Sequence, residues 1–310
     1  MELLIQLVLL VVGFYMLIKG ADFFVDGVSA IAERYGIPQL VIGLTIVAMG
    51  TSAPEAAVSI TAAFKNGADI TIGNVVGSNI INIFVILGLT AVITPIAVQM
   101  STLKYEIPYM ILATAALLAM GVIGGTVSRV DGVILWALFL VYLGYLLYMA
   151  KKGKEEPAQE EHHDSIVKLI FMSVVGVALI ILGSDVSVSA AKAIASAAGL
   201  SERFIGLTVV ALGTSLPELC TSITAAKKGK ADIAIGNIVG SNLFNILFVV
   251  GTTALITPVA FQTKFIVDMV VAIMAGVLLL LVTLRTKKLQ RWGGAIMLAA
   301  YVAYFIYLIA

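Results

Sequence analysis

The sequence predicts an all-α membrane protein with ten transmembrane helices, arranged as two inverted repeats of five helices. Three observations lead there: a low charge content, ten apolar segments of spanning length, and motifs that recur at one offset. Of the 310 residues, 61% are hydrophobic and 12% are charged. A soluble domain averages about 25% charged residues. This chain has too little charge to cover a surface that faces water, so lipid must cover much of it.

Ten segments approach or exceed the roughly 20 apolar residues that cross a bilayer. The predicted spans are residues 3–20, 39–64, 70–94, 106–124, 131–150, 166–183, 203–226, 233–257, 264–284 and 290–309. Glycine, proline, serine and asparagine interrupt the second, third, seventh and eighth spans, so we expect broken helices there. The first apolar run lacks the positive start and the cleavage pattern of a signal peptide, and is therefore predicted to be a membrane helix.

A polar stretch at 151–165 separates the first repeat, residues 1–150, from the second, residues 166–310. Its charges and proline predict a solvated linker, and its His162 and His163 are interpreted as linker residues rather than a metal site. On the predicted topology, 14 of the 19 Lys and Arg residues lie on the linker side. The positive-inside rule then predicts a protein of the cell membrane with a cytoplasmic linker and both termini outside.

Several classes of function are disfavoured. The net charge of +1 argues against a nucleic-acid partner, which would favour a basic face. The single cysteine, Cys220, rules out an internal disulfide and is expected to be a small packing residue. No H-E-x-x-H motif is present, so an intramembrane metalloprotease is disfavoured. We therefore expect that the protein is not an enzyme, and that it needs no cofactor and no obligate protein partner. The lipid bilayer is expected to surround it.

The two halves match at an offset of 163 residues. GTSAPE at 50–55 recurs as GTSLPE at 213–218, and GNVVGSNIIN at 73–82 recurs as GNIVGSNLFN at 236–245. Each half holds five predicted spans, and because five is odd the second half enters the membrane from the opposite side. Inverted repeats of this kind occur in secondary transporters, with ion sites near the bilayer midplane on discontinuous helices.

The GTSxPE motif predicts a helix break followed by a buried acid. Pro54 lacks an N–H and its ring clashes with the carbonyl of Gly50, so the helix should loosen and free carbonyls nearby. Glu55 follows this proline, and Glu218 occupies the same place in the second repeat. Two carboxylates brought together repel each other, and one takes up a proton unless a cation lies between them. Their two charges match one Ca²⁺, which takes 6–8 oxygen ligands.

The GNxxGSNxxN motif predicts a polar stripe on one helix face. Asn74, Ser78 and Asn82 are spaced i, i+4, i+8, and the second repeat has Asn237, Ser241 and Asn245 at the same spacing. Their oxygens suit Na⁺ and Ca²⁺, although small polar residues also promote helix packing in membranes. The paired glutamates favour an ion site. Of the other repeated acids, Asp69 and Asp232 are predicted to be helix N-caps. Asp22 and Asp185 lie near span ends and are predicted to be interfacial or capping groups.

At these motifs the sequence resembles the cation/calcium exchanger superfamily, specifically the prokaryotic sodium/calcium exchangers, whose two α-repeats carry G-T-S-x-P-E and G-N-x-x-G-S-N. The resemblance covers nearly the whole chain. It implies that Glu55 and Glu218 bind Ca²⁺, helped by the carbonyls of Thr51 and Thr214. It further implies Na⁺ sites completed by Ser52, Ser78, Ser215, Ser241 and the carbonyls of Ala48 and Ala211, with Asn82 and Asn245 bordering the central site. Some members have Asp at the last position, whereas this chain has Asn245.

The expected activity is exchange of Ca²⁺ for Na⁺ by alternating access, with both ions as substrates. The resemblance implies that the first and sixth spans move relative to the core. A Ca²⁺/H⁺ antiporter and a K⁺-dependent antiporter remain alternatives, because the same acids could carry protons or act with another cation. An uncoupled channel and an intramembrane enzyme are further alternatives, and the inverted repeats favour a carrier over a channel.

Overall fold

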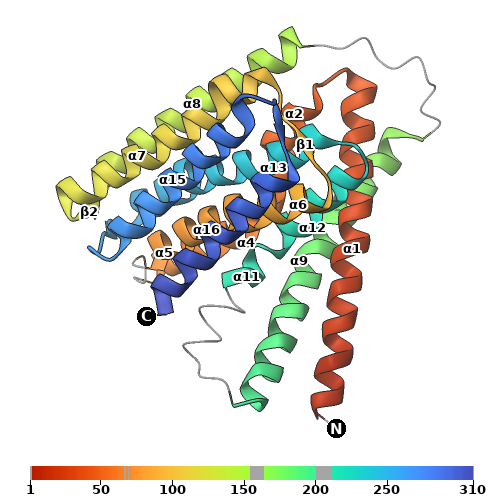
Figure 1. Ribbon diagram of the computed structural model, residues 1–310, viewed down its shortest axis with the longest axis horizontal. Coiled ribbons are helices and arrows are strands. Elements are labelled where there is room, and N and C mark those ends of the chain that lie inside the picture. Colours follow the sequence, from red (N-terminus) through yellow and green to blue (C-terminus); the bar gives the residue numbers. More distant parts are fainter. Residues whose placement is uncertain (1, 66–67, 69, 154–163, 200–210, 310) are drawn as a thin grey trace.

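The computed structural model is a bundle of helices and describes residues 2–65, 68, 70–153, 164–199 and 211–309 (Figure 1). Within these residues, eight helical segments are long and apolar enough to cross a membrane, or nine if one bent pair forms a single span. The uninterrupted segments are α1 (Glu2–Tyr35), α8 (Arg129–Lys152), α9 (Ile166–Ala197), α15 (Phe265–Leu284) and α16 (Arg291–Ile309). The chain is therefore a helical membrane protein, as predicted.

Three further spans contain a π-helical section, which in proteins often marks a functional region. The first joins α5 (Ile70–Ile81), η2 (Asn82–Leu87) and α6 (Gly88–Ile93). The second joins η3 (Thr102–Glu106) and α7 (Ile107–Gly124). The third joins α13 (Ala231–Leu243), η5 (Phe244–Val250) and α14 (Gly251–Ile256).

The bent pair is the second predicted span. It comprises α2 (Gln39–Ile42), η1 (Gly43–Val47), α3 (Ala48–Thr51) and α4 (Ala53–Phe64), with a bend of 50° between its two halves. Its counterpart is α11 (Ala211–Thr214) followed by α12 (Leu216–Lys227). The predicted span at 203–226 therefore begins in a segment, 200–210, that lies outside the described residues.

Two predicted spans, 3–20 and 166–183, are too short, because α1 and α9 continue for 34 and 32 residues. The charges that seemed to end the first span lie on a helix face with partners. Lys228 contacts Asp22 at 3.2 Å and Asp26 at 2.7 Å, and Lys230 pairs with Glu33. Paired in this way, the acids do not interrupt the helix. Asp22 lies inside α1 rather than at a helix end, and its interfacial position stays a prediction.

Helices α1 and α9 pack against each other through glycines and project away from the other helices (Figure 1). A Cβ added to Gly20 would lie 2.8 Å from the carbonyl oxygen of Gly176, and one added to Gly183 would lie 2.8 Å from that of Gly13. Small residues allow such close approach in membranes, where packing replaces the hydrophobic effect as the driving force. The pair thus forms a tightly packed unit.

The spans that carry the GNxxGSN motifs lie at the centre. In the α13–α14 span, 94% of the most apolar 18-residue stretch is buried inside the protein, and in the α5–α6 span 72% is buried. In each of the other six spans less than 40% is buried. Most of the hydrophobic core surrounds these two spans. A separate, smaller cluster joins α1 to α9 and α12 through residues such as Phe24, Ile180 and Ala225. The polar motifs are therefore held in the interior and away from lipid.

Two short β-ladders, absent from the all-α prediction, close the ends of the bundle. β1 (Ile96–Ala97) pairs with β4 (Lys288–Leu289), and β2 (Thr126–Val127) pairs with β3 (Val259–Ala260), both antiparallel. Each ladder satisfies the backbone polar groups of a connection that leaves the helical conformation. Each also joins one half of the chain to the other.

We predict that Gly20→Ala loosens the α1–α9 pair, because its methyl group would meet backbone atoms of α9 that must shift. Overpacking of this kind costs about 1–3 kcal/mol. Thermal unfolding in detergent should therefore begin at a lower temperature than in the unmodified protein. Gly144→Ala in α8 is the matched control, since a Cβ there meets nothing within 4 Å. Equal unfolding temperatures for the two variants would contradict this packing assignment.

Candidate ion-binding site

The two glutamates follow matching helix breaks. Ser52 separates α3 from α4 with φ −84° and ψ 8°, and Ser215 separates α11 from α12 with φ −91° and ψ 2°. Each break precedes a proline by two residues, so the predicted loosening of the helix is observed. Glu55 and Glu218 lie in the first turns of α4 and α12, and both side chains are 0% exposed.

Serine hydroxyls link the two acids into one cluster. Ser52 donates to Oε1 of Glu218 at 2.8 Å, and Ser78 donates to Oε1 of Glu55 at 3.2 Å. Ser78 also lies 3.3 Å from the hydroxyl of Ser215. The helix break at Ser52 therefore lies beside Glu218 of the second half, and the break at Ser215 lies beside Ser78 of the first half. Both carboxylates therefore belong to one cluster of hydroxyls, and two negative charges there would repel each other.

The hydroxyl of Ser241 makes longer contacts in the same cluster, 3.5 Å to Oε1 of Glu218 and 3.4 Å to the carbonyl of Ala48. That carbonyl also accepts the N–H of Ser52 at 3.0 Å. Threonines complete the surroundings, with Thr214 near the carboxylate of Glu55 and Thr51 near that of Glu218. Ala211 is the first residue of α11. Most of the predicted site residues are thus brought together.

Two asparagines that the sequence analysis did not single out organise the centre. The amide of Asn79 donates to the backbone carbonyl of Asn242 at 3.2 Å, and the amide of Asn242 donates to that of Asn79 at the same distance. Asn82 then donates to Oδ1 of Asn242 at 3.0 Å, and Asn245 to Oδ1 of Asn79 at 3.1 Å. Their presence at matching places in both motifs was the signal that could have revealed them.

The donors and acceptors in these bonds determine which end of each asparagine amide is oxygen and which is nitrogen. A backbone carbonyl can only accept, so the side-chain atoms of Asn79 and Asn242 that face it must be nitrogen. Their oxygens then accept from Asn245 and Asn82, which must present nitrogen in turn. The remaining atoms, Oδ1 of Asn82 and Oδ1 of Asn245, are buried and have no hydrogen-bond partner.

Within the described residues, four buried oxygens at the centre therefore lack hydrogen-bond partners, in two pairs related by the repeat. They are Oε2 of Glu55, Oε2 of Glu218 and the Oδ1 atoms of Asn82 and Asn245. An unsatisfied buried acceptor costs about 1–3 kcal/mol, and more if it is charged. Neutral and anionic oxygens are the ligands preferred by hard cations such as Na⁺ and Ca²⁺. The arrangement can therefore bind a hard cation chemically, because such an ion would give these oxygens a partner.

The polar stripe predicted on each motif helix has two roles. Its first member ties helices together: Asn74 donates to Ser59 at 3.0 Å and to the carbonyl of Glu55 at 3.3 Å. Asn237 makes the equivalent contacts at 3.0 and 3.4 Å, with Ser222 and the carbonyl of Glu218. The later members face the acids or the central asparagines. Asn74 and Asn237 therefore hold the backbone that carries each glutamate.

The other acids and histidines are placed as follows. Asp232 was predicted to be an N-cap, and this is wrong: Lys230 occupies the cap of α13, and Asp232 lies in its first turn and accepts from Gln99 at 2.7 Å. Asp69, His162 and His163 lie outside the described residues. Cys220 is half-buried and packs against the smaller hydrophobic cluster, as predicted. Within the described ranges, no group of three or more His, Cys, Asp or Glu side chains could hold a metal ion.

Comparisons with known proteins agree with this architecture. The family model described as sodium/calcium exchanger protein matches residues 5–148 and 168–310. A protein of Alkalimonas amylolytica named CaxA is 39% identical, over 97% of this chain and 98% of its own length. The sodium/calcium exchanger MaX1 of Methanosarcina acetivorans is 31% identical, over 98% of each chain.

A solved structure gives the same result in three dimensions. The sodium–calcium exchanger NCX_Mj, soaked in 10 mM Na⁺ without Ca²⁺, matches with a TM-score of 0.85 at 33% identity, covering 98% of this chain and 99% of that one. The resemblance carried by the four motifs is therefore confirmed along both halves of the sequence and in the fold. This chain belongs to the sodium/calcium exchanger family, in the prokaryotic branch of the cation/calcium exchanger superfamily.

Proposed function

We propose that this protein is an antiporter that exchanges Ca²⁺ for Na⁺ across the membrane, with Glu55 and Glu218 as the central ligands. The observation that carries this proposal is the set of four buried, unpartnered oxygens contributed by Glu55, Glu218, Asn82 and Asn245. Two of the four oxygens belong to carboxylates, so one Ca²⁺ would neutralise the site. Ca²⁺ is also large enough to accept ligands from several helices in an irregular shell.

The proposed ligands of the two ions overlap. Ca²⁺ would take the two carboxylates with the carbonyls of Thr51 and Thr214. Na⁺ sites would add four hydroxyls and two carbonyls: Ser52, Ser78, Ser215, Ser241, Ala48 and Ala211. Three of these serines now donate to carboxylate oxygens, and a hydroxyl that rotates can offer its lone pairs to a cation instead. Because both ions would need the same carboxylates, they would compete, which is the requirement for exchange.

We further propose that the ten spans form two inverted repeats, residues 1–150 and 166–310, joined by the linker at 151–165. The reciprocal bonds between Asn79 and Asn242 support a two-fold relation between the halves. The β-ladders support it as well, since β1 and β3 lie 163 residues apart and each pairs with a strand from the other half. The excess of Lys and Arg on the linker side supports a cytoplasmic linker and external termini in the cell membrane.

Alternating access would be provided by α1 and α9 moving as a unit against the core. Their close glycine packing supports motion as one body, and the smaller hydrophobic cluster is the surface at which this pair meets η1, α12 and α13. The acids lie on helices of the core, so the site would stay in place while access changes. An empty site holding two buried negative charges would be costly to occlude, which would limit uncoupled leak.

A second candidate is a Ca²⁺ antiporter coupled to H⁺ or K⁺. Buried carboxylates that lack counter-charges can take up protons in place of metal ions, so the geometry supports this alternative at the same atoms. Asn245 contributes no third acid to carry a proton. We therefore place Na⁺ first.

Proteoliposomes loaded with Na⁺, K⁺ or acid, and then diluted into ⁴⁵Ca²⁺, would distinguish the coupling ion. We expect uptake to depend on the outward Na⁺ gradient and to persist when the pH gradient is collapsed. If three or more Na⁺ leave for each Ca²⁺ that enters, net positive charge moves outward, so an inside-positive potential should speed uptake. Sodium-insensitive uptake driven by a pH gradient would replace Na⁺ with H⁺ in the proposal.

Glu55→Ala and Glu218→Ala should each abolish Ca²⁺ uptake, because each removes one of the two charges that balance the ion. Insertion and elution as a folded protein should be retained, since the substitution also removes a buried, unpartnered acceptor. The control is Asp268→Asn in α15, which alters an acid outside the site that accepts from Tyr304 at 2.7 Å. Normal transport by both glutamate variants would refute the site.

Asn79→Ala should raise the half-saturating concentrations of Na⁺ and Ca²⁺ by about tenfold. This is the lower end of the effect of removing a residue that orients a metal ligand. Asn79 has no unpartnered oxygen of its own. Its Oδ1 accepts a hydrogen bond from the amide of Asn245 and so holds that side chain in place. The readout is the concentration dependence of ⁴⁵Ca²⁺ uptake, with Trp136→Phe as a control that removes a bond to Thr252 outside the site. Unchanged half-saturation in Asn79→Ala would contradict the orienting role.

A further inference from the structure

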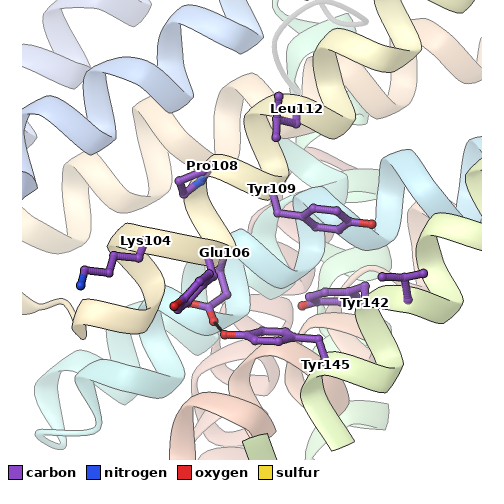
Figure 2. Close-up of a pocket in the computed structure, with 9 residues that line it drawn as sticks. Lys104, Glu106, Pro108, Tyr109, Leu112, Tyr142 and Tyr145 are labelled. Carbon is purple, nitrogen blue, oxygen red and sulfur yellow. Dashed lines mark hydrogen bonds between the residues drawn. The ribbon is translucent and has the colours of Figure 1, made fainter. Parts of the chain in front are cut away.

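A third buried acid lies outside the ion site. Glu106 is the last residue of η3, and its side chain is 1% exposed. Tyr145 of α8 donates a hydrogen bond to Oε1 of Glu106, while Oε2 has no hydrogen-bond partner among the described residues (Figure 2). The residue 163 positions further on is Met269, so this acid is not part of the repeated machinery. Nothing in the proposed exchange mechanism uses it.

Glu106 lines a cavity of about 320 Å³ between the η3–α7 segment and α8. Tyrosine side chains from both helices form its walls (Figure 2). The rings of Tyr109 and Tyr142 stack at 6.2 Å with 18° between their planes, and those of Tyr105 and Tyr145 lie 6.1 Å apart. The cavity is thus an aromatic pocket with one free carboxylate oxygen.

Three of the four tyrosine hydroxyls of this pocket are already used. Tyr109 donates to the carbonyl of Leu138 at 2.9 Å, Tyr142 to that of Leu44 at 3.0 Å, and Tyr145 to Glu106. The pocket therefore offers ring faces and one carboxylate oxygen rather than a shell of oxygens. A bare metal ion requires several oxygen ligands and would be poorly satisfied here. An organic ammonium group suits this lining, because it can bond to the carboxylate and lie over aromatic rings.

The pocket opens to lipid near the end of the span. Glu106 is four residues from Thr102, where the apolar span begins, so it lies about 6 Å along the helix from that end. The rim residues Leu112 and Val141 are exposed and apolar, as expected of side chains that face lipid. Lys104 also lines the pocket, and its amine points away from the tyrosine rings (Figure 2). A negative group could meet Lys104 while an ammonium group enters the pocket.

We propose that this pocket binds the headgroup of a phospholipid with a primary ammonium group, such as phosphatidylethanolamine. The ammonium would bond to Oε2 of Glu106 and contact the tyrosine rings, the phosphate would lie beside Lys104, and the acyl chains would follow Leu112 and Val141. A primary ammonium would supply the cation that Glu106 lacks, and the phosphate would supply an anion for Lys104. An anionic headgroup without an ammonium, such as phosphatidylglycerol, would bring no cation to Glu106 and should bind less well.

Native mass spectrometry of the delipidated, full-length protein tests the proposal. The protein would be titrated with an equimolar mixture of phosphatidylethanolamine and phosphatidylglycerol. We expect the unmodified protein to retain phosphatidylethanolamine preferentially. Glu106→Gln should reduce that retention by about tenfold, the effect of losing one charge-assisted hydrogen bond. Asp268→Asn is the matched control, because it also removes an acid bonded to a tyrosine in a membrane helix.

A second variant keeps the test decisive if Glu106→Gln does not fold. Leu112→Trp changes an exposed side chain at the rim and would fill the pocket entrance without touching the buried acid. It should also reduce phosphatidylethanolamine retention. Absence of any headgroup preference in the unmodified protein would overturn the proposal. So would a preference that survives both pocket variants, or a loss in Asp268→Asn as large as in Glu106→Gln.

Discussion

Two buried carboxylates without a buried counter-charge are the constraint on which the rest of this structure depends. Glu55 and Glu218 come from separate halves of the chain and lie in one hydrogen-bonded cluster. Among the described residues, no Lys or Arg is buried, so no basic side chain in the interior can neutralise them. Charge of this kind inside a membrane protein is costly unless a mobile cation or proton balances it. The helix breaks, the serines and the asparagines all surround these two acids.

The surroundings of the acids are rigid where orientation matters. Asn79 and Asn242 are bonded to each other's backbone, and through their oxygens they turn Asn82 and Asn245 so that two amide oxygens remain free. Such second-layer bonds orient metal ligands and contribute to affinity. The α1–α9 pair, in contrast, is held together by close glycine contacts and meets the core through a small apolar cluster. Well-oriented ligands in the core and a helix pair that contacts the core through apolar side chains are compatible with a site that stays still while access changes.

The outer helices connect the site to the lipid surface. Tyr142 lines the aromatic pocket and donates to the carbonyl of Leu44 in η1, four residues before Ala48. The helix that carries one half of the ion site is thereby bonded to a wall of the pocket. A lipid headgroup in the pocket would contact the same tyrosine.

The sequence alone determined the membrane class, the repeat, the helix breaks and the two central acids, because each depends on local composition or on identity at a constant offset. Pro54 and Pro217 predict the helix breaks that precede them. A buried glutamate in an apolar span has few structural roles. Only the tertiary structure decided which polar atoms are left unpartnered. Asn74 and Asn82 lie in one motif, yet one holds a helix and the other presents a free oxygen, since their partners come from distant segments. The pairing of charges that lets α1 run past Asp22, and the meeting of Glu106 with Tyr145 across two helices, also depend on contacts between residues far apart in the chain. No local pattern encodes such contacts.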